Sequence, residues 1–207
     1  FDHYSNAPID AIGSSAIAAS PALSRQQAVA TGLLRGVVDR QLAPSAAFDV
    51  QKMAAFIAVS DFFGSWHAVR WHNLRLYLNP ITLRLEPIPF DATLQDGLTN
   101  DNSIVNDEPF IIHLLSDPLM WAAYTEILAQ LDAMTLDGSL EKSLRESEQK
   151  QLAILRTEFR LLQEMRLTYL QPRVSALLQQ ARAAEGSGPA NPNFLVSAVA
   201  ERTEYPL

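Results

Sequence analysis

Two short runs of alternating apolar and polar residues predict a β-hairpin near the middle of the chain. The apolar positions of the two runs are Leu74, Leu76, Leu78, Ile81, Leu83 and Leu85. Between the runs, Asn79-Pro80 is typical of a turn. Successive strand residues face opposite sides of a sheet, so one face of this hairpin should be buried. We expect four leucines to pack together there: Leu74, Leu76, Leu83 and Leu85.

The residues before the hairpin show helical patterns. Ser24 and Gln27 form a capping box, which predicts a helix over residues 24–41. Asp49 should cap a second helix, which is apolar on nearly all sides up to Gly64 and is therefore expected to be buried. We expect this helix to be the partner of the hairpin leucines, through three of its side chains: Met53, Phe56 and Ile57.

Further helices are predicted after the hairpin. Pro109 should begin a helix that ends near Leu115, and Asp117-Pro118 is a cap followed by a first-turn proline. A narrow apolar stripe over residues 144–162 predicts a long helix, which Pro172 interrupts. The polar stretch over residues 92–108 is too long for a passive connection and is a candidate functional loop.

These patterns predict a mainly α fold with a central β-hairpin. We divide the chain into an irregular lead-in (1–20), a core (21–135), C-terminal helices (136–185), and a linker and tail (186–207). The Gly186–Asn193 segment, rich in glycine and proline, is predicted to be the most mobile part after the lead-in.

Composition narrows the classes of function. The 207 residues carry a net charge of −7 and include no cysteine, which excludes disulfides and thiolate metal sites. The negative charge disfavours nucleic acid as a partner, because phosphate contacts need clustered Lys and Arg. No apolar run reaches membrane-spanning length. Because the chain opens on Phe1 rather than Met, we expect a processed or truncated piece of a longer protein, and a mature secreted form would look the same.

Candidate chemistry lies at the two ends of the hairpin. Asn73 precedes it and Asp91 follows it, and the hairpin should bring them together. An amide oxygen and a carboxylate are hard ligands of the kind that Mg²⁺ takes in kinases, alongside phosphate. The competing interpretation is that both are ordinary cap and turn residues.

The sequence also resembles a known family. Residues 56–91, "FIAVSDFFGSWHAVRWHNLRLYLNPITLRLEPIPFD", and residues 107–131, "DEPFIIHLLSDPLMWAAYTEILAQL", are similar to the core of the CotH (spore-coat protein H-like) atypical kinases. The "HN" pair, the "LY" of the first strand and the final "PFD" stand in the order in which that family has its corresponding motifs. The resemblance covers roughly residues 48–135 and implies an α+β, protein-kinase-like C-lobe.

The resemblance implies that Asn73 and Asp91 hold Mg²⁺ and that ATP is the phosphoryl donor to a protein substrate. His67 stands where the family has its catalytic Asp, and Asp61 is a poorer positional match for that acid. Arg70 and Arg75 are candidates for phosphate binding, with surface ion pairing as the alternative. The family's N-terminal lobe, which holds the nucleotide-binding Lys, is not recognisable in this chain.

Three functions therefore remain open. The first is Mg²⁺-dependent phosphoryl transfer from ATP to a protein. The second is a non-catalytic structural or interaction module of an envelope or secreted protein, which kept the fold and lost the acid. The third is a plain helical scaffold in which the hairpin is incidental. Localisation stays open, with a secreted or envelope-associated protein compatible with the resemblance.

Other polar and aromatic residues carry weaker signals. A zinc site is the less favoured use of three histidines: His67, His72 and His113. Trp66 and Trp71 fit core packing better than base stacking. The acids of the long loop fit solvated turns and caps, with Asp96 the nearest candidate for a second metal ligand: Asp96, Asp101, Asp107 and Glu108.

Overall fold

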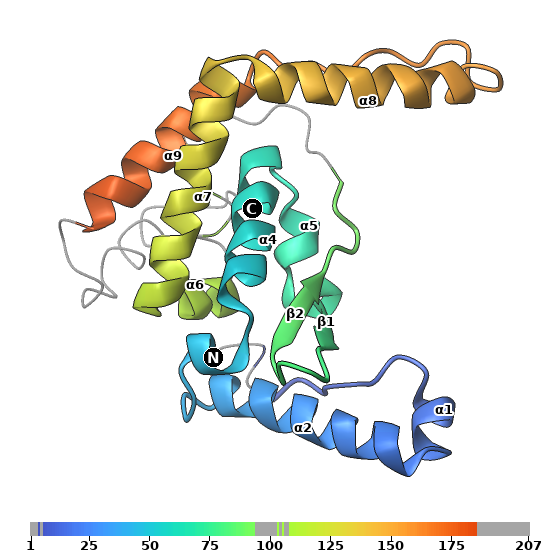
Figure 1. The fold of residues 1–207 in the computed structure, drawn as a ribbon, viewed down its shortest axis with the longest axis vertical. Coiled ribbons are helices and arrows are strands. Elements are labelled where there is room, and N and C mark those ends of the chain that lie inside the picture. Colours follow the sequence, from blue (N-terminus) through green and yellow to red (C-terminus); the bar gives the residue numbers. More distant parts are fainter. Residues whose placement is uncertain (1–3, 5, 94–102, 104, 106–107, 186–207) are drawn as a thin grey trace, which may run out of the picture.

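The computed structural model describes residue 4 and residues 6–93, 103, 105 and 108–185. Within them the fold is mainly helical, with a two-stranded antiparallel sheet (Figure 1). The elements are α1 (Ser14–Ala18), α2 (Pro21–Val38), α3 (Pro44–Ala47), α4 (Val50–Phe63), α5 (Trp66–Val69), the 3-10 helix η1 (Trp71–Asn73), β1 (Arg75–Leu78), β2 (Leu85–Ile88), α6 (Pro109–Leu115), α7 (Pro118–Leu136), α8 (Ser139–Leu155) and α9 (Leu170–Glu185).

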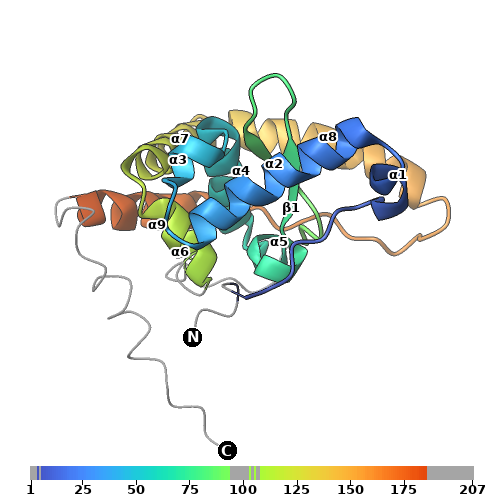
Figure 2. The ribbon, with the colours of Figure 1, turned by 90° about the horizontal axis from the view of Figure 1, so that it is seen from below.

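The core forms around α4, which packs against α7 and α9. Met53, Ile57 and Phe62 of α4 are wholly buried, as its apolar sequence predicts. The helix begins as expected, because the Asp49 carboxylate accepts a hydrogen bond from the Lys52 N–H at 3.1 Å. It ends at Gly64, which has a φ of 66°, the left-handed conformation that favours glycine. At opposite ends of this body lie α2 and α8 (Figure 1), and the view from below shows α2 crossing in front of α4 (Figure 2).

The hairpin is shorter than the alternation predicts. Strand β1 pairs with β2 from Arg75 opposite Ile88 to Leu78 opposite Leu85, so residues 79–84 form the turn. Asn79 holds this turn, because its Oδ1 accepts a hydrogen bond from the Ile81 N–H at 2.9 Å.

The prediction of four packed leucines is correct in part. Leu85 is 2% exposed and belongs to the core, and Leu74 and Leu76 pack against the core half-buried. The prediction is wrong for Leu83, which is 54% exposed and has a φ of 53°. Leu83 lies in the turn rather than in a strand, and so it does not share the inner face of the sheet.

Backbone contacts attach the hairpin to the start of α4. The Asp49 N–H donates to the Leu85 carbonyl at 2.9 Å, and Phe48 forms a parallel bridge with Leu85. The Arg84 guanidinium donates to the carbonyls of Ser45 and Ala46. Strand β2 is therefore hydrogen-bonded to the segment Phe48-Asp49, which leads directly into the buried helix α4.

The first long helix begins earlier than the capping box suggests. Ser20 caps α2 by accepting the Leu23 N–H at 3.4 Å, and Pro21 is its first residue. Ser24 lies inside the helix, where its hydroxyl donates to the Ile17 carbonyl at 2.9 Å. The lead-in is also more ordered than expected, since it contains α1 and since Tyr4 is 1% exposed in the core.

Helix α8 and the return segment (residues 156–169) form an arm that leaves the body and comes back to α9 (Figure 1). The predicted long helix thus ends at Leu155, and Pro172 lies in the first turn of α9 rather than interrupting a helix. Large apolar side chains are exposed toward the end of the arm. Three of them belong to the predicted stripe, Leu155, Phe159 and Leu162, and two lie outside it, Ile154 and Leu161.

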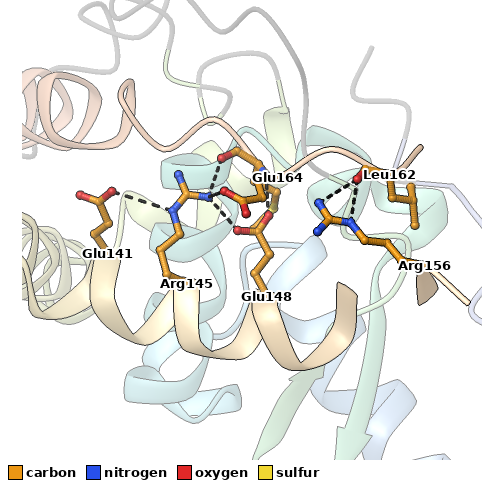
Figure 3. A network of polar contacts seen from close by, with 7 residues as sticks. Glu141, Arg145, Glu148, Arg156, Leu162 and Glu164 are labelled. Atoms are coloured by element: carbon orange, nitrogen blue, oxygen red, sulfur yellow. Dashed lines mark hydrogen bonds and ion pairs between the residues drawn. The ribbon is translucent and has the colours of Figure 1, made fainter. Parts of the chain in front are cut away.

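Polar contacts hold the return segment against α8 (Figure 3). The Arg145 guanidinium lies 2.7 Å from a Glu148 oxygen and donates to the Met165 carbonyl at 2.9 Å. Glu148 accepts the Met165 N–H through its other oxygen. Arg156 donates twice to the Leu162 carbonyl, at 3.1 and 2.9 Å. These contacts to backbone groups therefore fix the return segment, although its apolar side chains Phe159, Leu161 and Leu162 are exposed.

No helix in the part of the chain that the structure describes is long and apolar enough to cross a membrane. The Gly186–Asn193 segment, predicted to be mobile, lies outside the described residues.

Candidate functional site

The candidate site lies at the open end of the hairpin, where α5, η1 and the residues after β2 meet. The turn at Gly64 ends α4 and is followed directly by α5, which carries His67. The 3-10 helix η1 then ends at Asn73, whose N–H donates to the Arg70 carbonyl at 2.9 Å. Asp91, with a φ of 53°, follows β2. The hairpin thus returns the chain to η1, as the sequence predicts.

Asn73 connects the other two residues of the site. Its Nδ2 donates to the Asp91 Oδ2 at 3.0 Å and to the His67 carbonyl at 3.1 Å. The His67 Nδ1 lies 3.4 Å from the same Asp91 oxygen. Both side chains are 41% exposed, so a solute can reach them. The site therefore presents a carboxylate, an imidazole and an amide at the surface.

Arg75 lies beside this group on β1. Its guanidinium stacks over the Phe90 ring at 4.7 Å and donates to the His72 carbonyl at 2.9 Å. Arg70 turns to other partners: it lies 4.9 Å from the Trp66 ring and 3.5 Å from an oxygen of Glu108, which is 1% exposed. Of the two arginines predicted to bind phosphate, Arg70 contacts a carboxylate, whereas the Arg75 guanidinium contacts an aromatic ring and backbone carbonyls.

Asp61 does not belong to the surface site. It is wholly buried on α4, and its Oδ1 lies 3.2 Å from the guanidinium of Arg173, which is also wholly buried. Its Oδ2 accepts hydrogen bonds from the Tyr124 hydroxyl at 2.8 Å and the Ser103 hydroxyl at 2.6 Å. Burial, followed by the charge of Asp61, raises the pKa of Tyr124 well above its usual value, which keeps the phenol protonated as a donor. Asp61 is therefore buried away from the surface site and paired with Arg173, which does not suit the catalytic acid.

Sequence reasoning missed Arg173, which gave no signal apart from being a charged residue between apolar positions of a helix. In the structure its guanidinium also donates to the carbonyls of Asp61 and Phe62, each at 3.0 Å through Nε. These carbonyls belong to the last turn of α4, where carbonyl groups have no N–H donor four residues further along the helix. Arg173 is therefore a structural residue that joins α9 to the end of α4.

The three histidines considered for zinc do not come together. His113 is 8% exposed on α6, and its Nε2 lies 3.0 Å from the Val37 carbonyl. His72 is exposed on η1 and its backbone carbonyl, not its ring, contacts Arg75. Among the described residues no group of three His, Asp or Glu side chains is placed to hold a metal ion. Asp96, Asp101 and Asp107 lie outside those residues.

The remaining donors suit a cation that takes few protein ligands. Asp91 supplies a charged oxygen and Asn73 an amide, and Mg²⁺ in phosphate-binding sites is held by one or two such groups together with water and phosphate. The residue types therefore fit the metal that the CotH resemblance implies, with the Asn73 amide rotated from the orientation in which its Nδ2 donates to Asp91. Compared with known proteins, the chain matches no family model, no curated protein and no solved structure.

Proposed function

We propose that this chain is the C-lobe-like part of a CotH-type kinase and that it serves phosphoryl transfer from ATP to a protein. The observation that supports the proposal best is the 3.0 Å contact between Asn73 and Asp91 across the open end of the hairpin. Kinases use an Asn before and an Asp after such a segment to hold Mg²⁺ on the phosphates of the nucleotide. When bound, the cation would neutralise charge that develops on the transferred phosphoryl group.

The chain's own residues take distinct parts in this proposal. Asp91 would bind the cation through its carboxylate, and the Asn73 amide, whose Nδ2 faces that carboxylate in the structure, would rotate to add its oxygen. Arg75 would bind a phosphate oxygen, for which its guanidinium is suited. His67 would accept the proton of the substrate hydroxyl in place of the family's Asp, since an imidazole serves as a general base near neutral pH.

A second candidate is the non-catalytic interaction module. Two observations favour it. His67 faces Asp91 at 3.4 Å and brings no negative charge to the position of the family acid. The arm also exposes large apolar side chains, with Phe159 57% and Leu161 88% exposed, as in surfaces that contact another protein.

Ligand-linked stabilisation separates the two candidates. The midpoint of thermal unfolding would be measured with Mg²⁺ alone, with ADP alone and with both, for the wild-type chain, Asp91→Asn, and the exposed control Asp39→Asn. A ligand at 100 times its Kd stabilises the folded state by about 2.7 kcal/mol. The kinase proposal expects a higher midpoint with Mg²⁺ and ADP in the wild type and the control but not in Asp91→Asn. An unchanged wild-type midpoint at millimolar ligand would contradict it and favour the interaction module.

A further inference from the structure

The arm formed by α8 and the return segment ends in a group of exposed apolar side chains. Their exposed fractions run from 38% for Leu162 to 88% for Leu161, and the group also includes Ile154, Leu155 and Phe159. Figure 1 shows α8 running away from α7 and α9 toward this end of the arm. Large apolar side chains gathered on a surface mark a contact with a protein or with a membrane.

Backbone contacts fold the loop that carries these side chains. The Phe159 N–H donates to the Leu155 carbonyl at 2.8 Å, and the Leu162 N–H donates to the Phe159 carbonyl at 3.1 Å. The Arg156 guanidinium donates to the Leu162 carbonyl at 3.1 and 2.9 Å (Figure 3). The loop is thus ordered without burying its apolar side chains, and a surface that is already ordered loses less conformational entropy on binding.

The charge of the arm tip (residues 150–166) selects between the two kinds of partner. Basic residues outnumber acidic ones there by four to two, a net charge of +2, so the rest of the chain carries −9 of the total of −7. Of the two acids, Glu164 lies 3.9 Å from the Arg145 guanidinium. Among the described residues, none of the four basic side chains of the tip forms an ion pair: Lys150, Arg156, Arg160 and Arg166.

We propose that the arm tip docks on an anionic lipid surface, with Phe159 and Leu161 inserted beside the acyl chains and Arg160 and Arg166 at the phosphate headgroups. Leucine and phenylalanine combined with Lys and Arg are typical of segments that lie in the membrane interface. Apolar insertion binds any bilayer, and the basic residues add an attraction to anionic lipids. The acidic remainder of the chain is repelled by such a surface, which turns the arm tip toward it.

This inference is independent of the kinase proposal, because the contacts described for the arm involve no residue of the candidate site. It assigns the exposed side chains of the arm to a lipid surface rather than to another protein. Failure of the kinase proposal would appear separately, as an absence of stabilisation by Mg²⁺ and ADP.

Flotation with lipid vesicles tests the proposal. The chain would be mixed with vesicles of phosphatidylcholine alone, or of phosphatidylcholine with phosphatidylglycerol, and the bound fraction measured over a series of lipid concentrations. Two double variants separate the apolar from the charged contribution: Phe159→Ser with Leu161→Ser, and Arg160→Gln with Arg166→Gln. The control Ile81→Ser changes a side chain that is 90% exposed in the hairpin turn. Circular dichroism would show that each variant is folded.

The wild type and Ile81→Ser should bind the mixed vesicles more tightly than the neutral ones, and added salt should weaken this preference. The serine double variant should lose about tenfold or more in affinity for both kinds of vesicle, since each inserted side chain of this size contributes about that factor. The glutamine double variant should lose about tenfold or more on the mixed vesicles and little on the neutral ones.

Equal binding by the wild type and the serine double variant, or no wild-type binding at millimolar lipid, would overturn the proposal. Light scattering on the same proteins reports the competing occupant. A wild-type dimer that the serine double variant dissociates, without binding to vesicles, would show that the arm contacts a second copy of the chain and would equally overturn it.

Discussion

Replacing Arg173 by methionine should strongly destabilise the fold. The change removes a wholly buried guanidinium and leaves Asp61 as a buried carboxylate without its opposite charge. It also removes the donor to the carbonyls of Asp61 and Phe62 at the end of α4. Methionine keeps most of the side-chain volume, so the effect should come from the polar contacts rather than from a cavity.

The loss of unfolding free energy in Arg173→Met depends on which hydrogen bonds the Asp61 carboxylate keeps. Removing one partner of a buried ion pair costs about 3–5 kcal/mol. Hydrogen bonds from Tyr124 and Ser103 remain and pull the loss toward the lower value. The Phe62 carbonyl loses the Arg173 donor, which adds about 1 kcal/mol, whereas the Asp61 carbonyl keeps the Gly64 N–H at 3.1 Å. We expect about 3–5 kcal/mol in total, a third or more of the roughly 5–15 kcal/mol by which domains are stable.

Urea unfolding followed by far-ultraviolet circular dichroism would measure this loss. Arg182→Met, an exposed position on the same helix, is the matched control and should stay within about 0.5 kcal/mol of the wild type. The double variant Asp61→Leu with Arg173→Met should lose less than the sum of the two single variants, because no uncompensated charge remains. A loss below about 1 kcal/mol in Arg173→Met, or strict additivity, would refute the argument.

Two other predictions concern carboxylates that bind backbone N–H groups. Asp117→Ala should cost about 1–2 kcal/mol in the same urea assay, because it removes the cap of α7 at Leu119 and the acceptor of the Ser45 N–H, and an unchanged midpoint would contradict this. The hydrogen bond from the Met165 N–H, together with Arg145, lowers the pKa of Glu148 from its usual value of 4.5, although burial opposes this shift. The stability that the Glu148 carboxylate contributes is therefore complete above pH 4.5 and is lost as the pH falls through the lowered pKa. The protection of the Met165 amide from hydrogen exchange, relative to the intrinsic exchange rate at the same pH, should therefore fall in acid in the wild type and depend less on pH in Glu148→Gln; equal dependence would show that another group is responsible.

Sequence patterns predicted the helices whose ends depend on local chemistry. Asp49 and Asp117 cap α4 and α7 because a carboxylate close to free N–H groups needs no distant partner. Alternation predicted the wrong strand at Leu83, since a turn and a strand can share the same apolar spacing. The apolar stripe predicted a helix up to Leu162, but α8 ends at Leu155. The stripe alone cannot show where the helix ends, because the burial of its residues depends on neighbours far away in the sequence.

The proximity of Asn73 and Asp91 could be predicted, because a hairpin must bring its two ends together. The direction of the Asn73 amide and the approach of His67 could not, since both depend on how α5 and η1 turn after Gly64. The metal roles of these residues stay predictions. Nothing local pointed to Arg173 as the partner of Asp61, because their contact joins helices at distant positions in the chain.

The bond between Arg173 and the Asp61 carbonyl spans 112 positions in the sequence. Contacts of such high sequence separation close large loops and slow folding. During synthesis, residues 21–136 leave the ribosome well before Arg173 does, so α4 and α7 can meet while the end of α4 still lacks its cation. The order of synthesis therefore makes α9 the last described helix to join the core, and a nascent chain that stops before it would keep an uncompensated carboxylate at its centre.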